Sequence, residues 1–108
     1  MLRVYEDALE VVAALGPYVG EISGHDGDLA RQLKKARCSM PLNIAEGSSA
    51  RGARRNLHYS FAKGSADESI AVLETAHACG YIKEVPQPVV EKLRKIIGTL
   101  YKCIGGHR

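Results

Sequence analysis

Residues 32–47 have the sequence QLKKARCSMPLNIAEG, and the spacing of their side chains predicts an amphipathic helix. Apolar residues recur every three or four positions, as in a helix with one face on a core, and the basic residues lie opposite. Pro41 is expected to bend this helix without ending it, because the apolar pattern continues in register beyond it. The predicted apolar face consists of Leu29, Leu33, Ala36, Met40 and Ile44.

Three further segments show helical periodicity, at about residues 2–18, 53–78 and 88–104. Short connections separate the four segments, and none of them has the alternating pattern of a strand. Four helices with short loops favour an antiparallel up-down bundle. The predicted fold is therefore an all-α four-helix bundle that forms a single domain over residues 1–108.

Capping and breaking residues mark the expected ends of the helices. Gly16-Pro17 should kink or interrupt the first helix. Asp26 or Asp28 is a natural N-cap for the second, and Gly80 stands where a C-terminal stop of the third is expected. Pro86 and Pro88 precede the last helix.

The apolar faces of the other helices differ in width. The first helix has an apolar arc of about 200°, twice the width that one core requires, so a neighbouring subunit is expected to cover the surplus. The last helix has a continuous apolar face from Val90 to Ile104. On the third helix the predicted stripe is Leu57, Phe61, Val72, Ala76 and Cys79.

Composition limits the class of protein. The chain has 108 residues, 45% of them apolar and 25% charged, which suits one globular domain and not a disordered tail. No apolar run is long enough to span a membrane, and acidic residues near the N-terminus argue against a signal peptide. Three cysteines without a C-x-x-C pair argue against a disulfide framework or a zinc finger. A cytoplasmic location is therefore predicted.

Charge is distributed unevenly along the chain. The net charge is +3, but residues 31–63 alone carry +7, with Glu46 as their only acid, and the remainder carries −4. Such asymmetry favours an anionic partner, although a solvated basic face is the simpler alternative. The residues expected to contact phosphates of a nucleic acid are Arg31, Lys34, Lys35, Arg51, Arg54, Arg55 and Lys63.

Polar residues interrupt the apolar faces on two helices. Ser65 and Glu68 project close to the predicted stripe of the third helix, and Ser39, Asn43 and Glu46 follow one edge of the second. We expect the two rows to meet as a buried hydrogen-bonded network that fixes helix register, with Ala36, Ala62 and Gly64 allowing close approach. The alternative is a binding or catalytic pocket that uses Glu46 and Glu68.

No arrangement typical of an enzyme stands out. One E-x-x-H pair, Glu74 and His77, lies away from the core direction, whereas a di-iron bundle needs two such pairs and further glutamates. Neither glycine-containing stretch has the spacing of a phosphate-binding loop. We therefore predict no catalytic residues, no metal and no cofactor.

Two stretches resemble a known family. They are residues 32–47, quoted above, and residues 61–68, FAKGSADE, which are followed by ACGYI at 78–82. They are similar to the Q-L-R-R-A…S-I-P-x-N-I-A-E-G, A-x-G-S-x-x-E and L-G-Y motifs of four-helix-bundle proteins encoded in intervening sequences of bacterial 23S rRNA genes. Lys34-Lys35 replaces the common arginine pair, which keeps the charge but loses bidentate phosphate geometry.

The resemblance implies a cytoplasmic subunit that assembles into a ring-shaped homopentamer. The accessory variability proteins of diversity-generating retroelements share this fold and bind nucleic acid and a reverse transcriptase through basic surface. Ser39, Asn43, Glu46, Ser65 and Glu68 are motif positions, as is Gly47.

Three functional hypotheses follow. The first is a non-catalytic oligomer that binds a nucleic-acid backbone through its basic residues; with little aromatic interleaving apart from Tyr59, base stacking is not expected. The second is a scaffold or accessory subunit of a nucleic-acid-processing complex, with a protein such as a reverse transcriptase as its partner. The third, which has least support, is an enzyme that uses Glu46 and Glu68.

Overall fold

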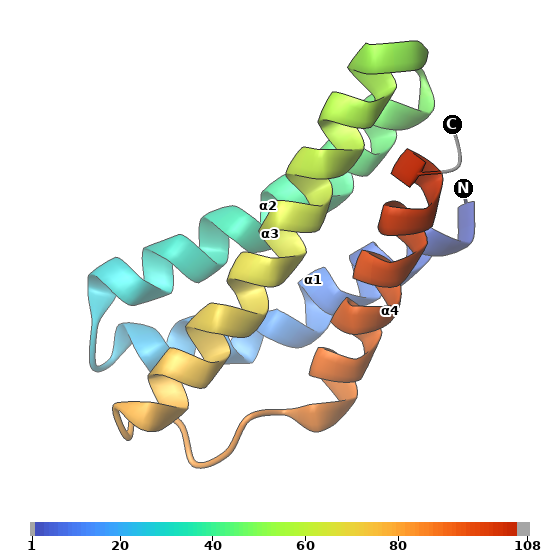
Figure 1. The fold of residues 1–108 in the computed structure, drawn as a ribbon. Coiled ribbons are helices and arrows are strands. Elements are labelled where there is room, and N and C mark those ends of the chain that lie inside the picture. Colours follow the sequence, from blue (N-terminus) through green and yellow to red (C-terminus); the bar gives the residue numbers. More distant parts are fainter. Residues whose placement is uncertain (1, 106–108) are drawn as a thin grey trace.

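The structure, a computed structural model, describes residues 2–105, with side chains from residue 3 onward. This part of the chain contains four helices and no strand, so the prediction of an all-α, four-helix fold is confirmed (Figure 1). The body is elongated, 43 Å long and 22 by 20 Å across. The helices are α1 (Leu2–Ser23), α2 (Gly27–Ser48), α3 (Gly52–Ala78) and α4 (Gln87–Gly105).

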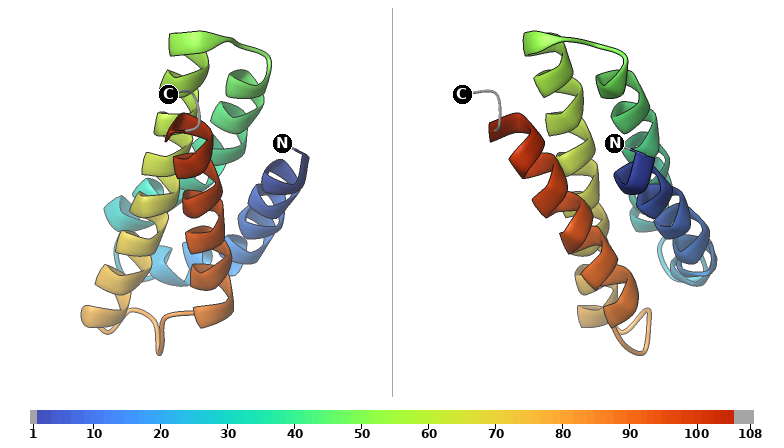
Figure 2. Two further views of the ribbon diagram at one scale, coloured as in Figure 1. Left: turned by 45° about the vertical axis from the view of Figure 1, so that its right-hand side comes forward. Right: turned by 90° about the vertical axis from the view of Figure 1, so that its right-hand side faces the viewer.

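Each helix packs against two others. α2 contacts α1 and α3, and α4 contacts α3 and α1, which closes the arrangement around one core. The beginning of α1 and the end of α4 lie toward the same end of the molecule, where these two helices diverge (Figures 1 and 2). α2 and α3 extend beyond them, and their connection forms the far tip of that end.

The core lies on the faces predicted for α1, α2 and α4. Leu15, Leu33 and Leu93 are fully buried, and the same helical spacing extends along each helix. On α1, Tyr5, Tyr18 and Val19 are half-buried and pack against this core, so the chain itself covers most of the wide apolar arc. Leu9 remains 44% exposed. The part of the apolar arc of α1 that is left for a neighbouring subunit to cover is therefore smaller than the sequence suggested.

The predicted stripe on α3 is wrong at three of its five positions. Leu57 and Phe61 are about half exposed, and Cys79 is exposed, whereas Val72 and Ala76 are buried. Small residues form much of the buried face of α3. Their alanine and serine side chains let α3 approach its neighbours closely. The buried residues with alternating spacing of three and four are Tyr59, Ala62, Ala66, Ser69, Leu73 and Ala76.

The helix ends follow the local chemistry. The Asp26 carboxylate caps α2 by accepting hydrogen bonds from the backbone N–H groups of Asp28 and Leu29, at 3.1 and 3.0 Å. Gly80 follows α3 with φ +81°, a conformation that favours glycine. Pro41 lies inside α2 without ending it, as predicted. Pro17 lies inside α1, which continues to Ser23, so the expected interruption there does not occur.

α2 lies directly against a side chain of α3 at Gly47. A Cβ atom added to this glycine would lie 2.5 Å from the Cδ1 and Cε1 atoms of Tyr59, closer than any real side chain tolerates. The Tyr59 hydroxyl lies 3.2 Å from Ser48 Oγ, which donates to the Ile44 carbonyl at 2.7 Å. The motif glycine therefore makes room for a buried aromatic ring.

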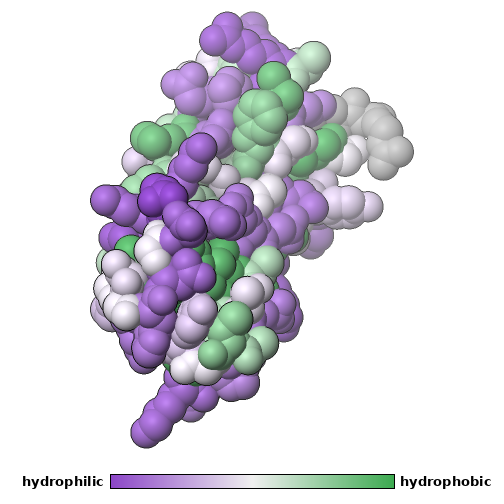
Figure 3. Space-filling model, turned by 90° about the vertical axis from the view of Figure 1, so that its left-hand side faces the viewer, coloured by the Kyte–Doolittle hydropathy of each residue, from purple (hydrophilic) through white to green (hydrophobic). Residues whose placement is uncertain are grey.

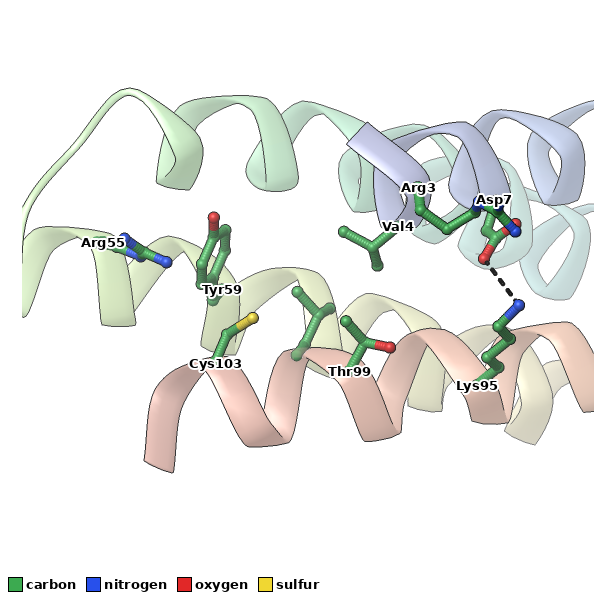
Figure 4. Close-up of a pocket in the computed structure, with 9 residues that line it drawn as sticks. Arg3, Val4, Asp7, Arg55, Tyr59, Lys95, Thr99 and Cys103 are labelled. Atoms are coloured by element: carbon green, nitrogen blue, oxygen red, sulfur yellow. Dashed lines mark ion pairs between the residues drawn. The ribbon is translucent and has the colours of Figure 1, made fainter. Parts of the chain in front are cut away.

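Ion pairs connect α1 to α4. Asp7 is 5% exposed, and its carboxylate lies 3.7 Å from Lys95 Nζ (Figure 4). Lys92 Nζ lies 4.0 Å from the same carboxylate. Glu10 accepts a hydrogen bond from Lys92, which lowers the pKa of Glu10 and raises the pKa of Lys92. These contacts join α1 to the first half of α4.

None of the four helices, over the described residues, combines the length and the apolar character that crossing a bilayer requires.

Candidate nucleic-acid interface

Six of the seven predicted basic residues fall into two groups toward opposite ends of α2, and the seventh, Lys63, lies further along α3. Arg31, Lys34 and Lys35 lie in the first half of α2, and the three arginines at 51, 54 and 55 lie at its connection to α3. At 1.5 Å per residue the groups are about 20 Å apart along the helix. One chain therefore presents two basic surfaces and not one continuous surface.

The arginines at the connection border a hollow of about 270 Å³. Arg51 and Arg54 line it together with Glu46, Ser49 and Ala50. Both guanidinium groups belong to exposed residues and form no ion pair within residues 3–105. Arg51 also precedes the first turn of α3, where no side chain caps the backbone N–H groups. Free N–H groups at a helix start and two arginines favour an anion here.

Arg55 points to a different place. Its guanidinium lies over the Tyr59 ring, 5.2 Å from the centroid, and its buried Nε has no hydrogen-bond partner among the described residues. It lines a cavity of about 150 Å³ between α1, α3 and α4. Figure 4 shows Arg55 and Tyr59 at one end of this cavity and Asp7 with Lys95 at the other. The cavity thus separates the Arg55 guanidinium from the ion pair of Asp7 and Lys95.

Two other predicted phosphate contacts are engaged within the chain. Arg31 pairs with Asp28, and Lys63 lies 3.4 Å from Asp67. Surface pairs of this kind are weak, so both cations remain able to exchange partners. Lys34 and Lys35 are exposed and have no ion-pair partner within residues 3–105.

The polar rows of α2 and α3 meet in part, as predicted. The hydroxyl groups of Ser39 and Ser65 hydrogen-bond across the two helices. Asn43 Nδ2 donates to the Ser39 carbonyl at 3.0 Å, and Asn43 Oδ1 accepts from His58 Nδ1 at 3.0 Å. Ala36 and Ala62 are buried nearby. Residue numbers rise on α2 as they fall on α3, so these bonds fix one register.

The two glutamates do not belong to this network. Glu46 and Glu68 are exposed, and neither carboxylate has a hydrogen-bond or ion-pair partner within residues 3–105. The prediction that they anchor a buried seam is wrong for the single chain. The error has a physical cause: on α3 the buried face is set by small residues, which places Glu68 and Gly64 outside. No heavy atom lies within 4 Å of a Cβ added at Gly64.

An aromatic pair on α3 was missed by the sequence analysis. Phe61 is 51% exposed, and the His58 ring meets it edge-on, with centroids 6.2 Å apart and an interplanar angle of 87°. Tyr59, the aromatic residue considered from the sequence, is 3% exposed. The side of the molecule in Figure 3 carries hydrophobic side chains among hydrophilic ones toward the tip formed by α2 and α3. Phe61 faces solvent because the buried face of α3 is the one formed by its small residues, which the pattern of large apolar residues did not indicate.

Metal-binding geometry is not found in the described part of the chain. No group of three or more His, Cys, Asp or Glu residues there is arranged to hold an ion. Glu74 and His77 are both exposed on α3, as predicted. The three cysteines are free thiols.

Fold and site together define a small four-helix protein with exposed basic groups on its second and third helices. Residues 1–105 match the family described as 23S rRNA-intervening sequence protein. The chain belongs to this family. No curated protein and no solved structure matches it.

Proposed function

We propose that this protein is non-catalytic and cytoplasmic and binds the phosphate backbone of RNA or DNA. The observation that carries the proposal is a set of exposed cations without ion-pair partners among residues 3–105, two of them beside the hollow of about 270 Å³. Cations of this kind release counterions from nucleic acid and supply sequence-independent affinity. Within the basic stretch 31–63, these cations are Lys34, Lys35, Arg51 and Arg54.

Assembly multiplies this weak contact. The proposed subunit is an antiparallel up-down bundle, and the proposed assembly is the homopentameric ring that the family resemblance implies. Five copies would repeat both basic groups around the ring, and simultaneous contacts raise avidity without any new interaction. Leu9, which stays 44% exposed on α1, is a candidate for burial between subunits.

A salt titration tests the proposal. Binding of single-stranded RNA and duplex DNA is measured at several salt concentrations for the parent protein and for Arg51→Gln/Arg54→Gln. The double variant should bind several-fold more weakly and with a shallower dependence on salt, because two phosphate contacts per subunit are lost. Arg94→Gln is the control, since Arg94 is an exposed arginine on α4. No binding at low salt, or equal binding by the double variant, would overturn the proposal.

A protein partner is the second candidate. Large apolar side chains are exposed on α2 and α3, namely Leu42, Leu57 and Phe61, at 65%, 50% and 51%. An accessory subunit that contacts an enzyme such as a reverse transcriptase would use such a surface. Co-purification that resists nuclease treatment would support this function. Loss of the partner on nuclease treatment would show that nucleic acid links the two proteins and would support the first function instead.

A further inference from the structure

We propose that the nucleic acid is bound single-stranded, with an unpaired base stacked on Phe61 and the neighbouring phosphates at Arg51 and Arg54. This inference rests on the proposed function and deepens it by naming the form of nucleic acid. The sequence argued against base stacking because its candidate, Tyr59, stood almost alone. The structure buries Tyr59 and exposes Phe61 instead, at 3% and 51%.

The Phe61 ring has a defined support. His58 meets it edge-on at 6.2 Å and 87°, and His58 is held by Asn43 through a 3.0 Å hydrogen bond. Asn43 is held in turn by the Ser39 carbonyl at 3.0 Å. Ordered side chains lose less freedom on binding, which favours a ring that is already positioned. The polar residues Ser39 and Asn43 of α2 thus help to position the exposed Phe61 ring through His58.

The distance from Phe61 to the arginines suits a single strand. Arg54 and Phe61 are seven residues apart on α3, which places them on the same side of the helix about 10 Å apart along its axis. Leu57, 50% exposed, lies between them on that side. One or two nucleotides of an extended strand span this distance, so a base on Phe61 leaves a phosphate near the hollow at Arg51 and Arg54.

A duplex does not satisfy both contacts. Its bases are stacked on one another and have no free face for an aromatic side chain, whereas an unpaired base has one. A duplex would therefore bind through the arginines alone. The form of nucleic acid and the role of Phe61 are thus tied to each other, and both can be tested with the same variant.

The first experiment compares three probes of equal length, about 12 nucleotides. They are an oligouridylate, an abasic oligonucleotide with the same phosphates, and a duplex. Phe61→Leu should weaken binding of the oligouridylate about fivefold or more, and should leave the abasic and duplex probes unchanged. Tyr101→Leu is the control, because Tyr101 is an aromatic residue on α4 that is 67% exposed.

A second variant reports stacking directly. The chain has no tryptophan, so Phe61→Trp introduces a single tryptophan at the proposed platform, whose emission can be excited apart from that of the five tyrosines. Oligouridylate should quench its emission, and the abasic probe should not. Equal quenching by both probes, or by neither, would overturn the stacking proposal.

The outcomes separate this proposal from the proposed function. If Phe61→Leu binds all three probes like the parent, stacking is overturned and backbone binding stands. If the parent binds none of them, both fail. The native mass of Phe61→Leu is measured in parallel. A smaller mass than the parent's would assign Phe61 to a subunit contact and overturn its role as a base platform.

Discussion

At Gly47 the backbone of α2 lies directly against the Tyr59 ring, while Gly64 faces open space on α3. Both glycines belong to the family motifs. A side chain at position 47 would collide with Tyr59, whereas one at position 64 would meet no neighbouring atom. The Gly47 contact explains a motif position by sterics alone. It also explains why a tyrosine so close to the arginines is unavailable to a ligand.

Gly47→Ala should therefore lower the free energy of unfolding by about 1 to 3 kcal/mol, because the new methyl group collides with a buried ring. Gly64→Ala is the matched control and should be neutral or stabilising by up to about 1 kcal/mol, since alanine favours an exposed helix. Urea denaturation of both variants checks this. Equal stability of the two would mean that Tyr59 moves away at no cost.

Glu46 provides a test of the hollow at single-residue scale. Its carboxylate lines the hollow with Arg51 and Arg54 and has no ion-pair partner within residues 3–105. Glu46→Gln should strengthen nucleic-acid binding about two- to fivefold, because a like charge is removed from the phosphate site. Fluorescence anisotropy at low salt measures the change. Weaker binding would show that Glu46 positions the arginines instead of repelling the ligand.

The sequence predicted single residues unevenly. Ser39, Asn43 and Ser65 were expected to connect α2 and α3, and they do, Asn43 through its hydrogen bond with His58. The same reasoning placed Glu68 and Phe61 on the buried face, and both are exposed, because it set the phase of α3 by its largest apolar residues. Helical spacing alone does not say which of two faces is buried when alanine and serine form the true one.

At the scale of the helices, caps and stops were the most predictable features. Asp26 and Gly80 act through local backbone geometry, which a short stretch of sequence determines. Contacts between helices far apart in the chain left no comparable signal. The ion pairs of α1 with α4 join residues more than 80 positions apart, and no local pattern pairs them.

The pair of Glu10 and Lys92 makes the α1–α4 contact depend on pH. Lys92 lowers the pKa of Glu10 below its usual 4.5, and Glu10 raises the pKa of Lys92 above its usual 10.5. The Glu10 contribution is present above pH 4.5 and is lost as the pH falls through its lowered pKa. The Lys92 contribution is present below pH 10.5 and is lost as the pH rises through its raised pKa.

Thermal melts of Glu10→Gln across pH check this. Its Tm should fall slightly below the parent's near neutral pH, and the gap should close in acid, where both chains lack the charge. Glu91→Gln, which removes an exposed acid of α4, serves as control and should show no such gap. A gap that persists in strong acid would mean that Glu10 acts by packing and not by charge.

For the whole molecule, assembly decides how the basic groups are presented. A single chain carries them at two ends of α2, about 20 Å apart, and a ring would bring copies of each group together. The exposed hydrophobic side chains are spread over all four helices, so one chain does not identify the contact between subunits. Assembly is thus the feature that neither sequence periodicity nor the fold of one chain determines.

Native mass spectrometry measures the number of subunits in the assembly. The parent should give five times the mass of one chain, and Leu9→Lys should give a smaller assembly, because a charge would enter an apolar contact. Tyr101→Lys is the control on α4. A parent mass equal to that of one chain would show that no ring forms, and the basic residues of each chain would then bind without avidity.

Photo-crosslinking reports where a nucleic acid lies on the protein. The parent is irradiated with an oligonucleotide that carries 4-thiouridine, digested with trypsin and analysed by mass spectrometry. If the nucleic acid is bound as proposed, the crosslink will lie in residues 56–63, the tryptic peptide that contains His58 and Phe61. Crosslinks confined to α1 or α4 would contradict this mode of binding.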